Sequence, residues 1–247
     1  IALPCMIYSM DLTVLNLAVP SISAELKPTS AQLLWIVDIY GFLVAGSLIT
    51  MGTLGDRIGP RQVLTRIVLW WSAFTSLTGA VASYPVLLLV RFCFGMGEAG
   101  AYPNAAIVIG RWMPSLTRAR AWGIVWMTAQ VGGAISPLLV VPIQMRYGWQ
   151  ASFFVFGVLG VIWAAAWYAW FRDWPSQKPG VSPCELEEIG TQPPVSHTGV
   201  PWGHALRSVR FWRIAVLAIC SVYSIAFFQS WLQTYLVRGR GYTEAAL

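Results

Sequence analysis

Charged residues are scarce in this 247-residue sequence, at 11% of the chain against the roughly 25% typical of soluble domains. Hydrophobic residues make up 57% of it. A chain of this composition cannot cover its surface with polar groups, so lipid must solvate a large part of it. The scarcity of charge excludes an ordinary soluble domain and indicates a membrane protein.

Residues that commonly carry catalysis or bind metals are also few. The only two histidines, His197 and His204, lie in a polar stretch outside the apolar segments. The four cysteines form no C-x-x-C pair: Cys5, Cys93, Cys184 and Cys220. The apolar segments hold no histidine, and we find in them no set of paired carboxylates and no serine beside a base. The sequence therefore predicts neither an enzyme nor a metal site.

Long apolar runs are abundant. Seven segments stand out: residues 1–22, 33–54, 63–82, 86–110, 119–142, 150–171 and 211–237. Each is long enough to cross the hydrocarbon core as a helix, which takes about 20 apolar residues. None shows the period-two alternation of an outer-membrane barrel. The sequence predicts an all-α membrane protein.

A polar stretch rich in Pro, Gly and Ser separates the sixth and seventh segments. We therefore expect a six-helix bundle over residues 1–171, a linker over 172–210 and the start of a second bundle over 211–247. Short surface helices are expected within LEEI and WGHALRSVRF of the linker. The chain opens at Ile1 without a basic n-region and ends where another helix begins, so we interpret it as a fragment.

The distribution of basic residues predicts the orientation in the membrane. If the turn between the second and third segments is cytoplasmic, eleven lie on that side: Arg57, Arg61, Arg66, Arg111, Arg118, Arg120, Arg172, Lys178, Arg207, Arg210 and Arg213. Four lie on the other side: Lys27, Arg146, Arg238 and Arg240. The positive-inside rule then makes the linker cytoplasmic, in a plasma or inner membrane. Loops facing anionic lipid explain the net charge of +6 without nucleic acid.

Four ionisable residues lie within the apolar segments: Asp11, Asp38, Arg91 and Glu98. A charge at the bilayer centre costs about 2.5 to 3.5 kcal/mol, so such residues usually face a bundle interior or an aqueous cavity. Arg91 and Glu98 share a helix face about 10 Å apart, with Glu98 near mid-membrane. We interpret the four as a polar pathway. Two alternatives remain open: structural salt bridges between helices, or an Arg91 that extends along its stem to the interface.

The turn GTLGDRIGPR resembles the signature loop G-x-L-a-D-R-x-G-x-[RK] between the second and third helices of the major facilitator superfamily. Its matching residues are Gly52, Gly55, Asp56, Arg57, Gly59 and Arg61. Gly52 and Gly55 permit close helix approach, Asp56 suits a helix N-terminus, and Arg57 and Arg61 suit the inner membrane surface.

The resemblance implies a major facilitator fold with twelve or fourteen helices in two halves, which alternate access to a central site. This chain would hold the six-helix N-terminal bundle and the first helix of a truncated second bundle. The resemblance also implies that Asp56 helps to latch one conformational state against the second half, which this chain lacks.

Two stretches point to different branches of that superfamily. From Asp56 to Ile189, blocks such as RFCFGMGEAGAYPNA, YGWQASFFVFGVLG and RDWPSQKPGVSPCELEEI resemble the anion:cation symporters, which move organic anions such as sugar acids. WLQTYLVRGRGYTEA is similar to that family's connection between the seventh and eighth helices. The stretch from Met10 to Gly46 is more similar to fourteen-helix drug:proton antiporters. Leu12 also replaces an arginine usual in the first helix of the anion symporters, and Gln150 the arginine of their GWR motif.

We expect Arg91, Asn104 and Gln130 to bind the substrate. We expect Asp11, Glu98 and Asp38 to exchange protons. The guanidinium of Arg91 presents a fork of N–H donors that suits a carboxylate or phosphate. The sequence thus predicts a monomeric symporter that imports small organic anions, uses the proton gradient as its energy source and needs no cofactor.

Three alternatives remain. A drug:proton antiporter would export lipophilic cations, with the carboxylates uncompensated and with Trp35, Tyr40 and Trp126 available for cation–π contacts. A seven-helix receptor or channel matches the segment count but not the linker. A chimera joined between residues 46 and 56 would explain the two resemblances.

Overall fold

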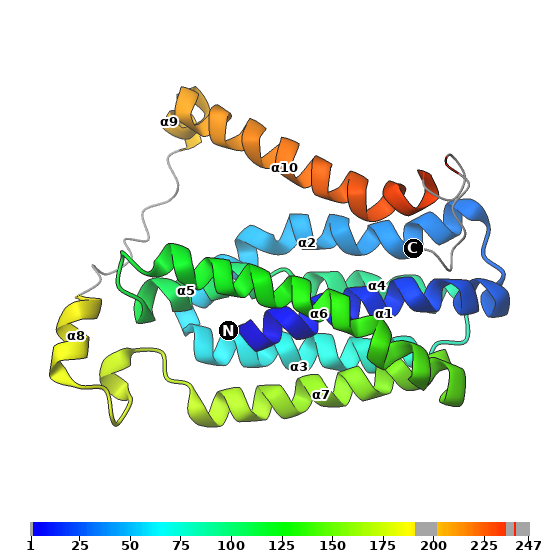
Figure 1. Cartoon of the computed structure of the whole chain (residues 1–247), viewed down its shortest axis with the longest axis horizontal. Helices are drawn as coiled ribbons and strands as arrows, with labels where there is room; N and C mark the ends of the chain where they lie inside the picture. Colours follow the sequence, from blue (N-terminus) through cyan, green and yellow to red (C-terminus); the bar gives the residue numbers. More distant parts are fainter. Residues whose placement is uncertain (1, 191–201, 236–239, 241–247) are drawn as a thin grey trace. The chain divides into compact units, whose positions relative to one another are not determined.

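The structure of this chain is a computed structural model that describes residues 2–190, 202–235 and 240. It divides into two compact units, Ile1–Pro193 and Pro194–Leu247. The first unit contains α1 (Ala2–Leu26), α2 (Ser30–Ile58), α3 (Pro60–Gly79), α4 (Tyr84–Glu98), α5 (Ala101–Trp112), α6 (Arg118–Tyr147), α7 (Trp149–Trp170), the 3-10 turn η1 (Pro175–Gln177) and α8 (Pro183–Ile189) (Figure 1). The second contains α9 (Trp202–Arg207) and α10 (Val209–Thr234). The described residues form no strand, which confirms the predicted all-α class.

Local sequence signals set several helix ends. At the start of α2, the Thr29 hydroxyl accepts a hydrogen bond from the Gln32 N–H, and the Gln32 side chain accepts one from the Thr29 N–H, which together form a capping box. Single glycines with positive φ separate two helix pairs: Gly59 (97°) between α2 and α3, and Gly148 (85°) between α6 and α7. Glycine takes up this backbone conformation without the steric penalty of a side chain, so both turns are sharp.

The fourth predicted segment, residues 86–110, is not one helix but two. It is interrupted at Ala99 and Gly100, between α4 and α5. Pro103 explains the interruption, because it has no N–H to donate to the carbonyl of Ala99 and its ring crowds that carbonyl. The helix resumes where the Asn104 N–H donates to the Gly100 carbonyl at 3.1 Å. The break lies directly after Glu98.

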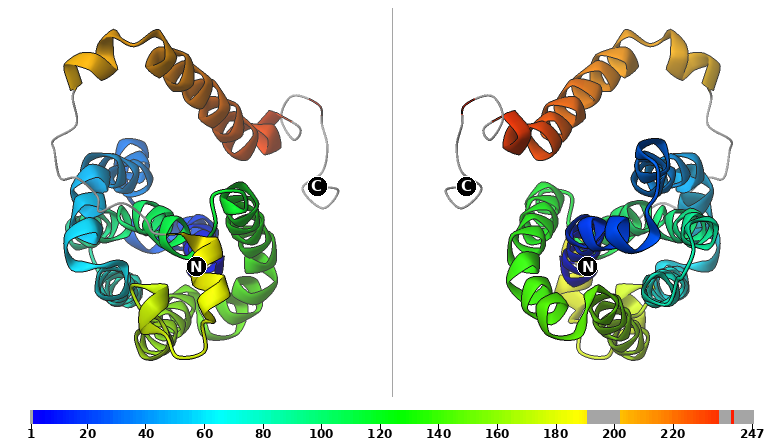
Figure 2. Two further views of the ribbon diagram at one scale, coloured as in Figure 1. Left: turned by 90° about the vertical axis from the view of Figure 1, so that its left-hand side faces the viewer. Right: turned by 90° about the vertical axis from the view of Figure 1, so that its right-hand side faces the viewer.

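Small residues let the helices of the first unit approach one another closely. The tightest pairs are α3 with α7, α1 with α6, and α2 with α4. A side chain at Gly132 would meet the Met6 backbone of α1, and one at Gly95 would meet the Tyr40 carbonyl of α2. Such contacts are typical of helix packing in membranes. The two end-on views show these helices gathered as a bundle (Figure 2).

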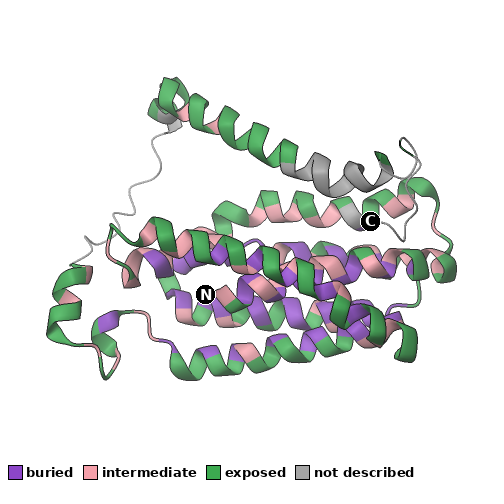
Figure 3. Ribbon diagram, in the orientation of Figure 1, coloured by how far each residue is buried: buried purple, intermediate pink, exposed green. Residues whose placement is uncertain are grey.

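Burial follows the inner faces of this bundle (Figure 3). Many large hydrophobic side chains are exposed on its outer faces. Leu89 is 61% exposed and Leu138 is 74% exposed, which suits contact with lipid rather than water. Among the described residues, four helices are long and apolar enough to cross a membrane by themselves: α1, α2, α6 and α7. The split of the fourth segment leaves α4 and α5 too short to meet that criterion.

The polar stretch after α7 forms η1 and α8, and α9 precedes α10. Helices α8 and α9 lie where the sequence predicted short surface helices. The boundary between the two units falls inside the predicted linker, but the proposed division at residues 171 and 210 stays a prediction. His197, Arg238 and the predicted end of the seventh segment lie outside the described residues.

Candidate functional site

Arg91 is buried in the middle of α4, with 2% of its surface exposed. Its guanidinium carbon lies 4.5 Å from the centre of the Phe94 ring and 5.1 Å from that of the Tyr40 ring of α2. These are cation–π distances. The Nε atom of Arg91 is buried and has no hydrogen-bond partner among the described residues. The side chain is therefore held inside the bundle, and it retains a free donor there.

Glu98 is the last residue of α4 and is 1% exposed. Both of its carboxylate oxygens are buried without a hydrogen-bond partner. The Tyr40 hydroxyl is nevertheless placed as a potential hydrogen-bond donor to this carboxylate. This hydroxyl, however, donates to the Tyr8 hydroxyl of α1 at 3.0 Å. The Glu98 carboxylate at the α4–α5 break is thus enclosed by protein, but its hydrogen-bonding capacity is not fully used.

Asp11 of α1 is 3% exposed and faces the same interior. One carboxylate oxygen, Oδ2, accepts a hydrogen bond from the Thr75 hydroxyl of α3 at 3.0 Å, and the other, Oδ1, has no partner. Arg91 lies within electrostatic range of both Asp11 and Glu98. Helices α1 and α4 therefore bring two carboxylates and one guanidinium together as a buried charge cluster, defined here as Asp11, Arg91 and Glu98.

The buried charge cluster leaves several polar atoms unsatisfied. Asp11 Oδ1, both oxygens of Glu98 and Arg91 Nε find no partner. A structural salt bridge would pair these donors and acceptors, because each unsatisfied buried polar group costs free energy. Arg91 is also enclosed by the bundle, which argues against the alternative in which its side chain extends outward. The unsatisfied polar atoms of the buried charge cluster are therefore suited to bind a ligand or a proton.

Three other predicted site residues lie elsewhere. Asp38 on α2 and Gln130 on α6 are exposed and do not join the buried charge cluster. Asn104 of α5 is fully buried, and its amide donates to the Gly100 carbonyl at 2.7 Å and to the Met51 carbonyl of α2 at 3.4 Å. The hydrogen bond to Met51 connects α5 to α2, a structural role that differs from the substrate contact expected from the sequence.

The signature loop docks on the end of α7. The backbone N–H of Arg61 donates to Asp173 Oδ1 at 2.8 Å. The Arg61 guanidinium donates twice to the Tyr168 carbonyl, at 2.9 and 2.6 Å, and its carbon lies 4.2 Å from the centre of the Tyr168 ring. A side chain at Gly59 would collide with the Asp173 carboxylate. The glycine therefore makes room for an anion at the positive end of α3.

The remaining loop residues match their expected surroundings only in part. Close helix approach is present, since Gly52 packs on Pro103 and Gly55 packs on Asn104 and Ile107 of α5. Asp56 was expected at a helix N-terminus, but the carboxylate bound there belongs to Asp173. Asp56 is half-buried in the last turn of α2, and Arg57 beside it is exposed.

Sequence reasoning missed Tyr8, Asp173 and Tyr168. Tyr8 lies one turn before Asp11 on α1, a spacing that places both on one helix face and offers a signal for it. Asp173 and Tyr168 are more than 100 residues from Arg61, and no local pattern connects them to it. Over the described residues, no three His, Cys, Asp or Glu side chains are grouped so as to hold a metal ion.

Comparisons with known proteins agree with this architecture. Residues 1–247 match the family model described as Major Facilitator Superfamily. The chain is 32% identical to a probable sulfoacetate transporter of Cupriavidus necator, covering 96% of this chain and 56% of that protein. It is 27% identical to a hexuronate transporter of Bacillus subtilis, covering 94% and 54%. A solved bacterial homologue of the human lysosomal transporter Spinster aligns over 98% of this chain and 55% of its own, with a TM-score of 0.70 and 22% identity. The chain spans about half the length of these relatives.

Proposed function

The chain belongs to the Major Facilitator Superfamily, and we propose that it forms the N-terminal half of a proton-coupled symporter for small organic anions such as sugar acids or carboxylates. One observation carries the proposal: the buried Arg91 guanidinium keeps an unpartnered N–H and lies within electrostatic range of two carboxylates that are also incompletely bonded. Relatives named as sulfoacetate and hexuronate transporters support an organic anion as the substrate.

Arg91 is suited to bind the anion. Its planar guanidinium offers up to five N–H donors in a fork that matches a carboxylate, and charge-assisted hydrogen bonds of this kind are about twice as strong as neutral ones. Little water competes at a side chain that is 2% exposed, so the electrostatic attraction is weakly screened. Gln130, exposed on α6, is a proposed partner for substrate hydroxyl groups.

Charge balance explains why protons would move with the substrate. With both carboxylates ionised, the buried charge cluster carries a net charge of −1, and a monovalent anion would bring it to −2. Protonation of Glu98 or Asp11 removes one negative charge, so anion binding and proton binding favour each other. This reciprocal coupling between two ligands is what symport requires. Asp38 is exposed on α2 and is the weaker candidate of the three proposed proton carriers.

Alternating access would come from movement of this half against a second half. Major facilitator proteins have two such halves, and the chain spans about half of its relatives. In the proposal, substrate and protons enter from outside, the halves rock, and both leave toward the cytoplasmic side. The loop from Gly52 to Arg61 would latch one of these states, and a single copy of the whole protein would suffice.

The export of lipophilic cations fits the site less well. Trp35 and Trp126 are exposed and available to a cation, at 49% and 54%. Arg91, however, would repel a cation approaching Asp11 or Glu98. The anion proposal uses all three charges, and the cation alternative leaves the arginine without a role.

Uptake of labelled glucuronate into proteoliposomes containing the full-length protein tests the proposal. We expect an inward proton gradient to drive accumulation, and Arg91→Ala to abolish it. Arg146→Ala, which removes an exposed arginine from the last turn of α6, should leave uptake unchanged. Uptake that ignores both the gradient and Arg91, together with extrusion of a cationic dye, would favour the antiporter instead.

A further inference from the structure

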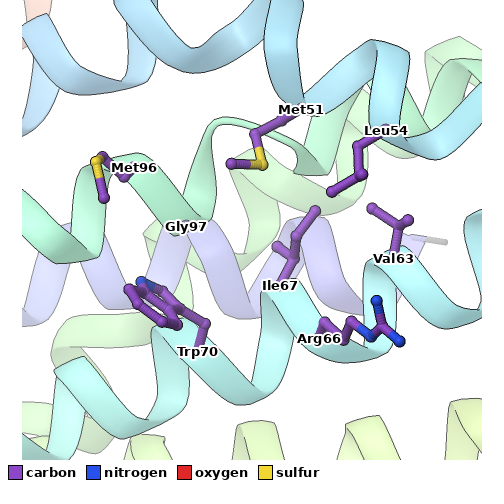
Figure 4. A pocket seen from close by; sticks show the side chains of 8 residues that line it. All are labelled: Met51, Leu54, Val63, Arg66, Ile67, Trp70, Met96 and Gly97. Carbon is purple, nitrogen blue, oxygen red and sulfur yellow. The ribbon is translucent and has the colours of Figure 1, made fainter.

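A crevice of about 200 Å³ opens between α2, α3 and α4, and none of the residues that line it belongs to the buried charge cluster (Figure 4). Its walls are apolar and include Met51 and Leu54 of α2, Ile67 and Trp70 of α3, and Met96 of α4. Arg66 is the one charged residue that lines it. The crevice thus combines a long apolar wall with a single positive charge.

Trp70 and Gly97 form one end of this crevice (Figure 4). The Trp70 indole N–H donates to the Cys93 carbonyl of α4 at 2.8 Å, which fixes the ring against that helix. A side chain at Gly97 would collide with the ring, so the glycine leaves space for it. The ring also packs against Phe74, with 4.9 Å between the ring centroids, and is 44% exposed. The Trp70 ring is therefore held in a fixed position and forms a rigid part of the crevice wall.

Arg66 stands at the opposite end, beside Val63 and Leu54, while Trp70 and Met96 lie at the far end (Figure 4). It is exposed in the second turn of α3, about 9 Å along the axis from Pro60. No hydrogen bond among the described residues uses its guanidinium. In the predicted orientation this end of α3 is cytoplasmic, at a depth where a long arginine side chain reaches lipid phosphates.

We propose that this crevice binds an anionic phospholipid of the inner leaflet, with one acyl chain against the apolar wall and the phosphate at Arg66. Apolar contact alone selects no particular lipid, because a chain that enters the crevice leaves an equally apolar environment. Selectivity therefore depends on the charge of Arg66, since basic pockets between helices on the cytoplasmic side favour anionic head groups. The inference does not depend on which substrate the protein carries.

Photo-crosslinking tests this lipid site. The full-length protein is placed in phosphatidylcholine nanodiscs that contain a small fraction of phosphatidylglycerol bearing a diazirine in its acyl chain, and labelled peptides are mapped by mass spectrometry. We expect labels near Met51 and Met96, several times stronger than with a matched phosphatidylcholine probe. Arg66→Gln should lower phosphatidylglycerol labelling about fivefold, the effect of one arginine at an anionic surface, and leave the phosphatidylcholine signal unchanged.

Three further variants test the position of the arginine, the volume of the crevice and the need for a positive charge. Arg213→Gln removes an exposed arginine from the second turn of α10 and should leave labelling intact. Leu54→Trp fills the crevice and should lower labelling by both probes, whereas Arg66→Lys should keep the preference for phosphatidylglycerol. Equal labelling by the two probes, indifference to Arg66→Gln, or no label in the crevice would overturn the proposal. The last result would mean that the rest of the protein covers this face.

Discussion

Arg91 shows how a buried charge can be tolerated without being fully paired. A charge in the hydrocarbon core costs about 2.5 to 3.5 kcal/mol on insertion scales. Desolvated cation–π contacts, such as those with Phe94 and Tyr40, return about 2 kcal/mol. The opposite charges of Asp11 and Glu98 further favour the charged form of Arg91. The arginine is thus stable in place while its Nε stays available to a ligand.

Glu98→Gln should separate proton coupling from substrate binding. The amide keeps the shape of the side chain but is uncharged and cannot take up or release a proton near neutral pH. We expect the variant to exchange labelled for unlabelled anion across the membrane at near the wild-type rate. It should lose at least tenfold of the accumulation driven by a proton gradient, as measured in proteoliposomes.

Asp38→Asn is the matched comparison for Glu98→Gln. Asp38 is exposed and stands outside the buried charge cluster, so its neutralisation should leave proton-driven accumulation within about twofold of wild type. If Asp38→Asn abolishes accumulation and Glu98→Gln does not, the assignment of the proton site to the α4 carboxylate is wrong.

At the scale of helices, the α2–α3 turn depends on the end of α7. Asp173 places a carboxylate at the N-terminus of α3, where the helix dipole favours negative charge by about 0.3 to 1 kcal/mol, and by up to about 2 when partly buried. Arg61 adds two hydrogen bonds to the Tyr168 carbonyl. These contacts fix the signature loop to one rigid helix of its own bundle, which a latch between moving halves needs.

Gly59→Ala should destabilise this turn for two reasons. Alanine is strained at a φ of 97° and a ψ of 143°, a conformation almost restricted to glycine, by about 1 to 3 kcal/mol, and its methyl group would collide with the Asp173 carboxylate. Gly180→Ala is the control, since Gly180 has a φ of 99° but open space around it. Thermal unfolding in detergent should show a larger decrease of Tm for Gly59→Ala. Equal decreases would mean that contact with Asp173 adds nothing.

Substitution of Asn104 tests whether this residue stabilises the packing of α5 on α2 or contacts the substrate. Its amide connects the Gly100 and Met51 carbonyls, and loss of a buried hydrogen bond costs about 1 to 3 kcal/mol. Asn104→Ala should therefore lower Tm while leaving the KM for the anion within about twofold. A KM raised tenfold or more at unchanged Tm would return Asn104 to the substrate site, as the sequence predicts.

The helices themselves were largely predictable, and their faces were not. Runs of about 20 apolar residues predict where helices cross a membrane, and α1, α2, α3, α6 and α7 follow from them, but the break that divides the fourth segment into α4 and α5 does not. A helix that is apolar all round carries no signal for which side is buried. This is why the sequence could not separate Asp38, which is exposed, from Asp11, which is buried. Distant partners such as Arg61 and Asp173 meet only through the packing of α3 on α7.

At the scale of the whole molecule, the account requires a membrane orientation with α8 in the cytoplasm. Cys184 is an exposed thiol on α8, whereas Cys5 is buried and Cys93 is half-buried; Cys220 is also exposed but lies in the apolar helix α10, which is expected to be in the membrane. A membrane-impermeant maleimide should therefore label Cys184 in inside-out vesicles and not in right-side-out cells. Cys184→Ser identifies the labelled site. Labelling from the outside of intact cells would reverse the predicted topology and, with it, the inner-leaflet position of Arg66.

The central claim is that anion and proton cross together through the buried charge cluster of α1 and α4. It is tested most directly by recording the pH outside weakly buffered proteoliposomes, without an imposed gradient, when glucuronate is added. The account predicts that the outside medium becomes more alkaline as protons enter with the anion, and that Arg91→Ala removes the signal. Anion entry with no pH change, or with acidification of the medium, would contradict it.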